Sequence, residues 1–394
     1  MSGYVADRAK EMEVSPIRRI AELSARVKDG IPFHSGDPAF DTPSHIREAA
    51  KKALDDGYTH YSGSPGLLEL REAISQKISR DHDIEYNPKT EIVVTEGGTW
   101  AIYLSLLTTI NPGDEVLVPN PFFPSFPSLV KLVGGVAKFY SIVEEEGEYC
   151  IDISDIESKI TERTKMVVLN SPHNPTGAIL TSKEVEAVAD LVRHEDVLVL
   201  SDEIYEKVIF EGRRHISIAS IPEMKERVVT IQGFSKTYAM TGWRLAYIAA
   251  PSELAEPMAR MEGVTHIGAN TFVQKAAVAA LKGPQEEIVK MVDELRKRRN
   301  VMIDELNRIE GIRCIRPFGG LFAFPDVSEM DLSEDELVSY LAEEAHVFCV
   351  PGSAFGENGR GHIRLTYALP HEKMVSGLKR MHETIAHAKI TRRR

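Results

Sequence analysis

Residues 166–205 read MVVLNSPHNPTGAILTSKEVEAVADLVRHEDVLVLSDEIY, with two apolar runs on either side of a polar turn and an amphipathic segment. The runs at 166–169 and 197–200 are rich in β-branched residues and are bounded by Asn, Pro and Asp, which is typical of buried strands. The segment 182–193 has the periodicity of a helix and a hydroxyl residue at its start as a cap. This stretch therefore predicts a strand, a helix and a second strand.

The same alternation extends along the chain on both sides. Apolar runs of the same kind occur at residues 92–94, 115–118 and 228–231, and a helical segment occurs at 99–110. Strands that alternate with helices form a mainly parallel sheet covered by helices on both faces, so we expect an α/β fold. Such sheets bind ligands in the crevice at the carboxyl ends of their strands. Polar residues that follow these strands are therefore candidate site residues.

A long amphipathic segment at residues 284–310 predicts a helix that leads into a different pattern. Beyond it we expect short strands at 320–324, 347–350 and 362–368, a helix at 333–345, and a final helix. This mixture is typical of an α+β unit rather than of a parallel sheet.

The two patterns predict two domains of unequal size. We expect a large domain at 45–284 and a smaller, discontinuous α+β domain formed by residues 1–44 and 285–394. The pattern of the first forty residues is compatible with packing on either unit.

Composition excludes several classes of partner. The chain has 394 residues, with 47 Lys+Arg against 59 Asp+Glu, which gives a net charge of −12. This acidic balance disfavours binding to nucleic acid or to an anionic membrane surface, and no apolar run approaches the length of a membrane span. The locally basic segment at 389–394 is expected to be a solvated tail.

The cysteines indicate a reducing compartment. Cys150, Cys314 and Cys349 are odd in number, far apart and without a C-x-x-C spacing, so neither a disulfide framework nor a zinc site is expected. Residues 1–12 lack the apolar core of a secretory signal. We therefore expect a cytoplasmic protein without a bound metal.

Polar residues follow three of the predicted strands, at 170–177, 201–205 and 232–244. Taken singly they have ordinary explanations: a turn for the first segment, a helix cap for Asp202, and a solvated charge for Lys236. Their joint position at successive strand ends is better explained by a binding site in the expected crevice.

With these residues in this order, the chain resembles the class I and II aminotransferases of fold type I, which use pyridoxal 5′-phosphate. The resemblance extends from about residue 35 to residue 365. Its most specific part is Ser235-Lys236 followed by Gly242-Trp243-Arg244, with the lysine and the arginine eight residues apart.

The resemblance implies roles for individual residues. Lys236 matches the catalytic lysine that condenses with the cofactor aldehyde and then carries a proton. Asp202 matches the carboxylate that keeps the cofactor ring nitrogen protonated, and Arg364 matches the clamp for the substrate carboxylate. The other matched cofactor positions are Gly97, Gly98, Thr99, Phe123, Asn174, Tyr205, Ser235, Arg244 and, in the neighbouring subunit, Tyr61. The substrate positions are Gly36, Asn174 and Arg364.

The chain departs from the family pattern at two positions. Gly233 stands where many members have a serine that contacts the phosphate, and Ser235 is the residue that would compensate. Phe123 stands where many members have Trp or Tyr, so a stacking ring is retained without a polar group. Family precedent also predicts cis bonds at Asn120-Pro121 and Asn174-Pro175.

The implied reaction is a ping-pong transamination between an amino acid and a 2-oxo acid, in a homodimer whose active sites are shared through Tyr61. Aspartate with 2-oxoglutarate is the leading expectation, because it is the commonest activity of similar sequences. Aromatic or alanine donors are alternatives, because we find no second arginine for a distal carboxylate. A β-lyase of the cysteine-S-conjugate type uses the same motifs. A cofactor-binding regulator with a degenerate site is a further alternative.

Overall fold

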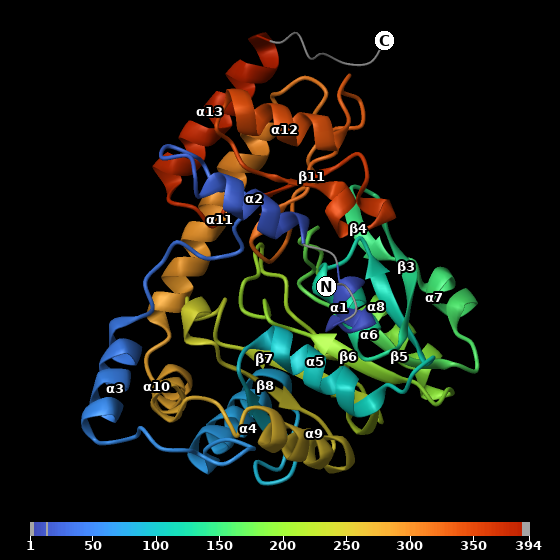
Figure 1. Cartoon of the computed structure of the whole chain (residues 1–394), viewed down its shortest axis with the longest axis vertical. Helices are drawn as coiled ribbons and strands as arrows, with labels where there is room; N and C mark the ends of the chain where they lie inside the picture. The colour runs from blue at the N-terminus through green and yellow to red at the C-terminus, as the bar shows by residue number, and fades with distance from the viewer. Residues whose placement is uncertain (1–3, 13–14, 388–394) are drawn as a thin grey trace.

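The computed structural model of the protein describes residues 4–12 and 15–387 (Figure 1). The basic tail at 389–394 therefore lies outside the described residues. The strands are β1 (Ile92–Thr95), β2 (Glu115–Asn120), β3 (Val136–Glu145), β4 (Glu148–Ile151), β5 (Thr164–Asn170), β6 (Leu198–Asp202), β7 (Val228–Gly233), β8 (Ala246–Ala249), β9 (Phe322–Ala323), β10 (Val350–Pro351) and β11 (Ile363–Thr366).

The α-helices lie between and after these strands. They are α1 (Asp7–Lys10), α2 (Pro16–Ser24), α3 (Ser44–Asp55), α4 (Leu68–His82), α5 (Gly98–Thr109), α6 (Ser125–Leu132), α7 (Ile153–Lys159), α8 (Ser182–Arg193), α9 (Ser252–Thr265), α10 (Thr271–Lys282), α11 (Glu286–Leu306), α12 (Glu334–Glu344) and α13 (His371–His387).

Eight strands form one large sheet in the order β1-β8-β7-β6-β5-β2-β3-β4. The five central strands, from β7 to β3, are parallel to their neighbours, whereas β1, β8 and β4 pair antiparallel at the two sides. All five predicted strands of the large unit are present, and the predicted α/β class with a mainly parallel sheet is confirmed.

Helices cover both faces of this sheet, as predicted. One apolar core joins the sheet to α3, α4, α8 and α10, and a second joins its other face to α5, α6 and α9. Residues of the central strands are buried on both faces, for example Val167 in the first core and Val168 in the second. This alternation explains why the strands read as continuous apolar runs.

A smaller antiparallel sheet, in the order β10-β11-β9, packs with α11, α12 and α13 around a separate apolar core. Figure 1 shows α11 running from the large sheet up into this unit. Ile31 and Phe33 of the N-terminal segment belong to the same core, and Ile31 forms a parallel bridge with Val347. The segment before α3 therefore packs on the smaller unit.

The strands of the smaller unit are shorter than predicted. The segment 320–324 forms only the two-residue strand β9, because Gly320 has φ +74° and its N–H donates to the carbonyl of Val208 rather than to a sheet partner. Val347 leaves the expected strand to pair with Ile31, so that β10 begins three residues later.

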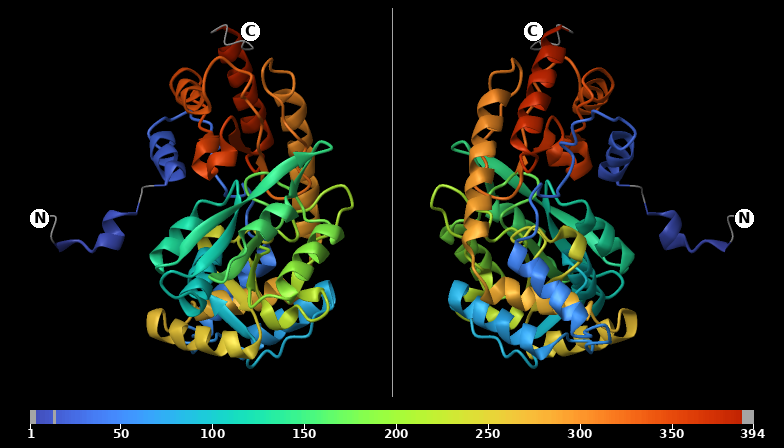
Figure 2. Two further views of the ribbon diagram at one scale, coloured as in Figure 1. Left: turned by 90° about the vertical axis from the view of Figure 1, so that its right-hand side faces the viewer. Right: turned by 90° about the vertical axis from the view of Figure 1, so that its left-hand side faces the viewer.

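Helix α1, near the N-terminus, projects away from the body of the molecule (Figure 2). Within residues 4–12 and 15–387, no helix combines the length and the apolar character needed to cross a bilayer. The three cysteines are free.

Candidate active site

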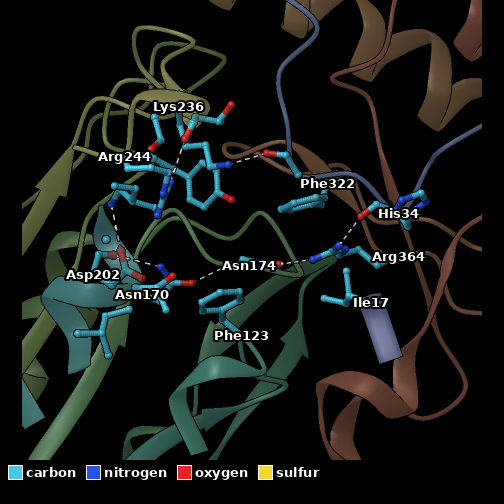
Figure 3. A pocket seen from close by; sticks show the side chains of 18 residues that line it. Ile17, His34, Phe123, Asn170, Asn174, Asp202, Lys236, Arg244, Phe322 and Arg364 are labelled. Carbon is cyan, nitrogen blue, oxygen red and sulfur yellow. Dashed lines mark hydrogen bonds between the residues drawn. The ribbon is translucent and has the colours of Figure 1, made fainter. Parts of the chain in front are cut away.

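A cavity of about 250 Å³ lies at the carboxyl ends of β5, β6 and β7, facing the smaller sheet (Figure 3). It is the crevice in which the sequence predicts a site. The predicted residues that line it are Gly36, Gly98, Thr99, Phe123, Asn174, Asp202, Tyr205, Ser235, Lys236, Arg244 and Arg364.

Lys236 enters the cavity from the loop that follows β7. Its Nζ donates a hydrogen bond to the backbone carbonyl of Gly36 at 2.6 Å. Burial lowers the pKa of the Lys236 amine to about 8, and the charge of Asp37 only partly opposes this effect. At pH 7 about a tenth of this amine is therefore uncharged and able to act as a nucleophile or a proton acceptor, far more than for a lysine with the ordinary pKa of 10.5.

Asp202 is the last residue of β6 and is buried at the opposite wall of the cavity. Its Oδ1 accepts a hydrogen bond from the backbone N–H of Ile204 at 3.2 Å. Burial raises the pKa of Asp202 to about 7. In the described part of the chain Asp202 forms no salt bridge, so a cationic ligand group would stabilise its charged form.

Asn170 links the residues at the carboxyl ends of β5 and β6. Its side chain donates to the carbonyl of Asp202 at 3.1 Å and accepts from the backbone N–H of Asn174 at 2.9 Å. The Oδ1 of Asn174 in turn accepts from Nη1 of Arg364 at 3.1 Å. A chain of hydrogen bonds thus runs from the backbone carbonyl of Asp202 through Asn170 and Asn174 to Arg364 (Figure 3).

Arg364 on β11 is buried between two aromatic rings. Its guanidinium lies 4.0 Å from the ring centroid of Phe322 and 4.8 Å from that of Phe355. Nη2 donates to the carbonyl of His34 at 2.9 Å, whereas the buried Nε has no hydrogen-bond partner among the described residues. Burial lowers the pKa of Arg364 to about 10, so it stays charged at neutral pH and can receive a carboxylate.

The turn between β1 and α5 forms a cradle for an anion. Gly97 has φ +95°, and a Cβ at this position would lie 2.3 Å from Nη2 of Arg244. The next residue, Gly98, begins the twelve-residue helix α5, whose first N–H groups have no partner within the helix. Arg244 itself is held by the carbonyl of Thr241 at 2.9 Å.

Two predicted residues, Tyr61 and Gly97, do not line this cavity. Gly97 adjoins the cavity through its contact with Arg244. The Tyr61 side chain is 82% exposed, so within one chain it has no contact with the site. Tyr205, in contrast, is buried beside the cavity and meets Phe322 edge to face, with centroids 6.4 Å apart. The predicted cis bonds at Asn120-Pro121 and Asn174-Pro175 are present, together with one at Ser171-Pro172.

Several lining residues were not predicted. Asn170 and Thr241 lie inside the polar segments that follow β5 and β7, so their position was the available signal. Ile204 lies in the segment 201–205 and Ile102 follows Thr99 on α5, but neither has a polar side chain to mark it. Ile17, His34 and Phe322 reach the cavity from distant elements, where no local signal marks them.

Comparisons with known proteins agree with this geometry. The model of the family "Aminotransferase class I and II" matches residues 28–381. The chain is 40% identical to an aspartate aminotransferase of Pyrococcus abyssi over 98% of this chain and all of that protein. It is 39% identical to aromatic-amino-acid aminotransferase 2 of Thermococcus litoralis, covering 98% of this chain and 99% of that protein.

The structural comparison gives the same family. The crystal structure of an aromatic aminotransferase from Pyrococcus horikoshii superposes with a TM-score of 0.90 at 40% identity, over 94% of this chain and all of that chain. The alanine aminotransferase of Pyrococcus furiosus superposes with a TM-score of 0.92 at 34% identity, over 97% of this chain and all of that chain. The protein therefore belongs to the class I and II aminotransferases, enzymes that depend on pyridoxal 5′-phosphate and act on small amino and oxo acids.

Proposed function

We propose that this aminotransferase holds pyridoxal 5′-phosphate through Lys236 and moves the amino group of aspartate or an aromatic amino acid to a 2-oxo acid such as 2-oxoglutarate. The observation that carries this proposal is that the partly buried Lys236 and the buried Asp202 and Arg364 surround one cavity. None of the three forms a salt bridge within the described residues. Buried charges without partners are costly, so the cavity favours a ligand with complementary charges.

The residues present fit this cofactor. At the cradle formed by Gly97–Thr99, Arg244 can lie against the turn only because Gly97 lacks a side chain, which places a guanidinium beside the free N–H groups at the start of α5. Asp202 provides the negative charge that a protonated ring nitrogen needs, and Lys236 provides the amine that an aldehyde needs. When bound, the cofactor withdraws electrons from the substrate carbon, which no side chain of the protein can do.

The proton at the substrate Cα is the one that Lys236 would carry. With its pKa near 8 the amine is uncharged often enough to accept this proton and basic enough to return it. Its hydrogen bond to Gly36 holds Nζ at the edge of the cavity, beside the segment that would contact the substrate. The lysine therefore needs no second base.

Arg364 would orient the substrate by its carboxylate. The N–H groups not used by Asn174 and His34 remain available for a carboxylate, including the unpartnered Nε–H. Phe322 and Phe355 restrict the guanidinium plane and keep water from it. A substrate held here would place its Cα between Arg364 and Lys236.

The cavity supports an aromatic donor as well as aspartate. Beyond the three polar anchors, its wall includes the apolar side chains of Ile17, Ile102, Phe123 and Phe322. Lys236, Arg244 and Arg364 are its only Lys or Arg residues among those described, and each has a role above. A distal carboxylate would thus need a cation from elsewhere, whereas an aromatic ring needs only the apolar wall.

A donor screen tests this proposal. The cofactor-loaded protein would be mixed with aspartate, phenylalanine, tyrosine, alanine or cystathionine, without an oxo acid, and the change in visible absorption would be followed. We expect rapid conversion by aspartate or by the aromatic donors, and reversal on addition of 2-oxoglutarate. Release of a 2-oxo acid and ammonia from cystathionine in place of reversible exchange would contradict the proposal.

The proposal includes a homodimer with shared sites. The support is that Tyr61 is 82% exposed and does not line the cavity of its own chain. Mixing Lys236→Ala subunits with Tyr61→Ala subunits tests this: a mixed dimer has one site with both wild-type residues, so activity should return. No recovery after subunit exchange, with exchange verified by tagged subunits, would contradict shared sites.

Two organisational predictions remain part of the proposal. A large domain at 45–284 and a small domain from 1–44 and 285–394 are supported by the separate apolar cores and by the packing of Ile31 and Phe33 on the smaller unit. A cytoplasmic location is supported by three unpaired cysteines, and a fluorescent fusion would test it.

A further inference from the structure

A second cluster of ionisable side chains lies behind the glycine turn. Glu96 directly precedes Gly97, Glu262 lies in the last turn of α9, and His266 follows that helix. One ligating atom from each of the three lies within 4.8 Å of the others. Nε1 of Trp100 donates to Oε2 of Glu262 at 2.6 Å, and the Trp100 ring packs 4.1 Å from that of His266. The proposed reaction uses none of these side chains.

The two carboxyl groups cannot satisfy each other while both are ionised. Glu262 is fully buried, and its Oε1 and the Oε2 of Glu96 are buried without a hydrogen-bond partner among the described residues. An ionised carboxylate only accepts hydrogen bonds, whereas a protonated one also donates. Burial, reinforced by the neighbouring Glu96 carboxyl group, raises the pKa of Glu262 to about 8. One shared proton would satisfy both oxygens.

We propose that Glu262 is a positioning residue that stays protonated at neutral pH, donates a hydrogen bond to Glu96, and thereby holds the turn that receives the cofactor phosphate. This inference rests on the proposed function, because it assigns the phosphate to Gly97–Thr99. The position of the turn at Gly97–Thr99 would then depend on the protonated Glu262, which lies outside the cavity.

The backbone explains how this pair would act on the cradle. Nη2 of Arg244 approaches the carbonyl oxygen of Glu96 at 3.5 Å and lies against Cα of Gly97. A displacement of Glu96 would therefore move both components of the cradle, the free N–H groups at the start of α5 and the guanidinium. Two ionised carboxylates in this confined space would repel each other and cause such a displacement.

The groups that face Glu262 come from several elements. Glu96 comes from the β1–α5 turn and His266 from the chain after α9, while Tyr103 on α5 packs behind the indole that contacts Glu262. Arg244 reaches the carbonyl of Glu96 from the loop after β7. A divalent cation bound by the two glutamates and the histidine is the competing occupant of this cluster.

The sign of the pH dependence follows from the direction of the shift. The pKa of Glu262 in the folded protein, about 8, lies above its ordinary value of 4.5. Between these values the folded protein holds a proton that the unfolded chain releases. The stabilisation is therefore complete below about pH 4.5 and is lost as the pH rises through 8.

Glu262→Gln removes this titration while keeping the shape, because its amide can donate to Glu96 and accept from Trp100. Glu262→Leu is the matched control that keeps bulk but makes neither bond. For cofactor-free protein we expect the Tm of the Gln variant minus that of wild type to grow from pH 5 to 8 and then level off. A difference that does not change with pH, or a Gln variant no more stable than the Leu variant, would overturn the proposal.

Cofactor affinity tests the link to the cradle. We expect wild type and Glu262→Gln to bind pyridoxal phosphate equally at pH 6.5, and the variant to bind about three- to tenfold more tightly at pH 9, the value of one net hydrogen bond. If the ratio of the two proteins' affinities for pyridoxal phosphate is the same at pH 6.5 and at pH 9, this link is overturned. Failure of both proteins to bind the cofactor would instead overturn the proposed function, while the Tm comparison still decides on the shared proton.

The cation alternative has its own readout. Both proteins would first be treated with a chelator. Addition of Mn²⁺ or Zn²⁺ should then leave the Tm of wild type and the Tm of Glu262→Gln unchanged. A metal-dependent rise in Tm that is present in wild type and absent from the variant would overturn the shared proton.

Discussion

Asp202 and Glu203 are adjacent on the chain at the end of β6, yet their surroundings are opposite. Asp202 faces the cavity, where it has one backbone N–H donor. Glu203 points away from the cavity into a dense polar network. Its side-chain partners are Ser201 at 2.9 Å, Ser217 at 2.7 Å, Gln232 at 2.8 Å and His215 at 3.0 Å.

The two carboxyl groups consequently titrate in opposite directions. Burial raises the pKa of Asp202 to about 7. Burial also opposes ionisation of Glu203, but the charge and hydrogen bonds of His215 and its neighbours outweigh it and lower the pKa to about 2. The comparison teaches that a binding site is made by leaving buried charges without partners, while the same types of residue stabilise the fold where partners are provided.

The largest expected effect comes from comparing two lysines, one that faces the cavity and one that is paired behind the sheet. Lys236 faces the cavity, whereas Lys77 is fully buried behind the sheet, where it pairs with Glu206 and donates to Gln232 at 2.7 Å. We expect Lys236→Ala to reduce turnover by about a thousandfold or more and to abolish the visible absorption of bound cofactor. Steady-state kinetics and absorption spectra measure both effects, and retention of both would contradict the assignment.

Lys77→Met is the matched control for that experiment. Removing one member of a buried ion pair should cost about 3–5 kcal/mol in the free energy of unfolding, because the buried Glu206 loses its lysine and keeps only His82 and Gln232. The variant should nevertheless bind cofactor wherever it is folded. Denaturant titration and absorption spectra separate the two roles.

The neighbouring carboxylates provide the second test. Asp202→Asn should lower kcat by about a hundredfold or more, because it removes the charge opposite the cofactor ring. Above pH 7 it should make the cofactor-free protein at least as stable as wild type, since an unpaired buried charge is lost. Glu203→Gln should instead lower the free energy of unfolding by about 3 kcal/mol. Equal effects of the two variants on stability would contradict the comparison.

Two buried arginines show the same contrast between a side chain without a salt bridge and one with a salt bridge, and here the effect is on substrate binding. Arg364→Lys should raise KM for the amino donor by about a hundredfold, as expected for the loss of a bidentate charged contact worth about 3 kcal/mol. Arg299 is also buried, but both of its terminal nitrogens pair with Glu211. Arg299→Lys should therefore lower Tm and leave KM unchanged.

The smallest expected effect is the opposite pH dependence of stability. The folded pKa of Asp202 lies above its ordinary value of 3.8, so its contribution is lost as the pH of the cofactor-free protein rises from about 4 to 7. Glu203 is shifted below 4.5, so its contribution is present above that value and lost as the pH falls towards 2. Each slope is at most about 1.4 kcal/mol per pH unit.

Each of the two slopes is isolated by subtracting the free energy of unfolding of Asp202→Asn or of Glu203→Gln from that of wild type. The free energy of unfolding would be measured by denaturant titration at several pH values for both variants and for wild type. Slopes of the same sign would show that the two carboxyl groups do not differ as described.

Elements with a strong local pattern were predictable. Strands β1, β2, β5, β6 and β7 agree with the apolar runs, and α8 agrees with the helical periodicity. Thr181 forms the expected cap with Glu184. Strand β8 was not predicted, because Ala246–Ala249 carries little β-branched character and depends on pairing with β1 and β7. The hairpin of β3 and β4 was missed as well, since its partly exposed residues lack a continuous apolar run.

The site divides in a similar way. Residues directly after a strand, such as Asn174, Asp202 and Lys236, were found because parallel strands end at one edge of the sheet. Ile17 and Phe322 were not found, because they reach the cavity from the N-terminal helix α2 and from the small sheet. No local pattern encodes which distant segment closes a cavity.

The sequence by itself determined the chemistry available to this protein, because residue types and their order after strands are local properties. Only the tertiary structure decided which of those residues meet: Lys236 contacts Gly36 across 200 residues, and Arg364 contacts Asn174 across 190. It also decided which acid is paired and which is not. Burial and partners set the pKa of Asp202, Glu203 and Glu262, and both depend on packing between segments that are far apart in the chain.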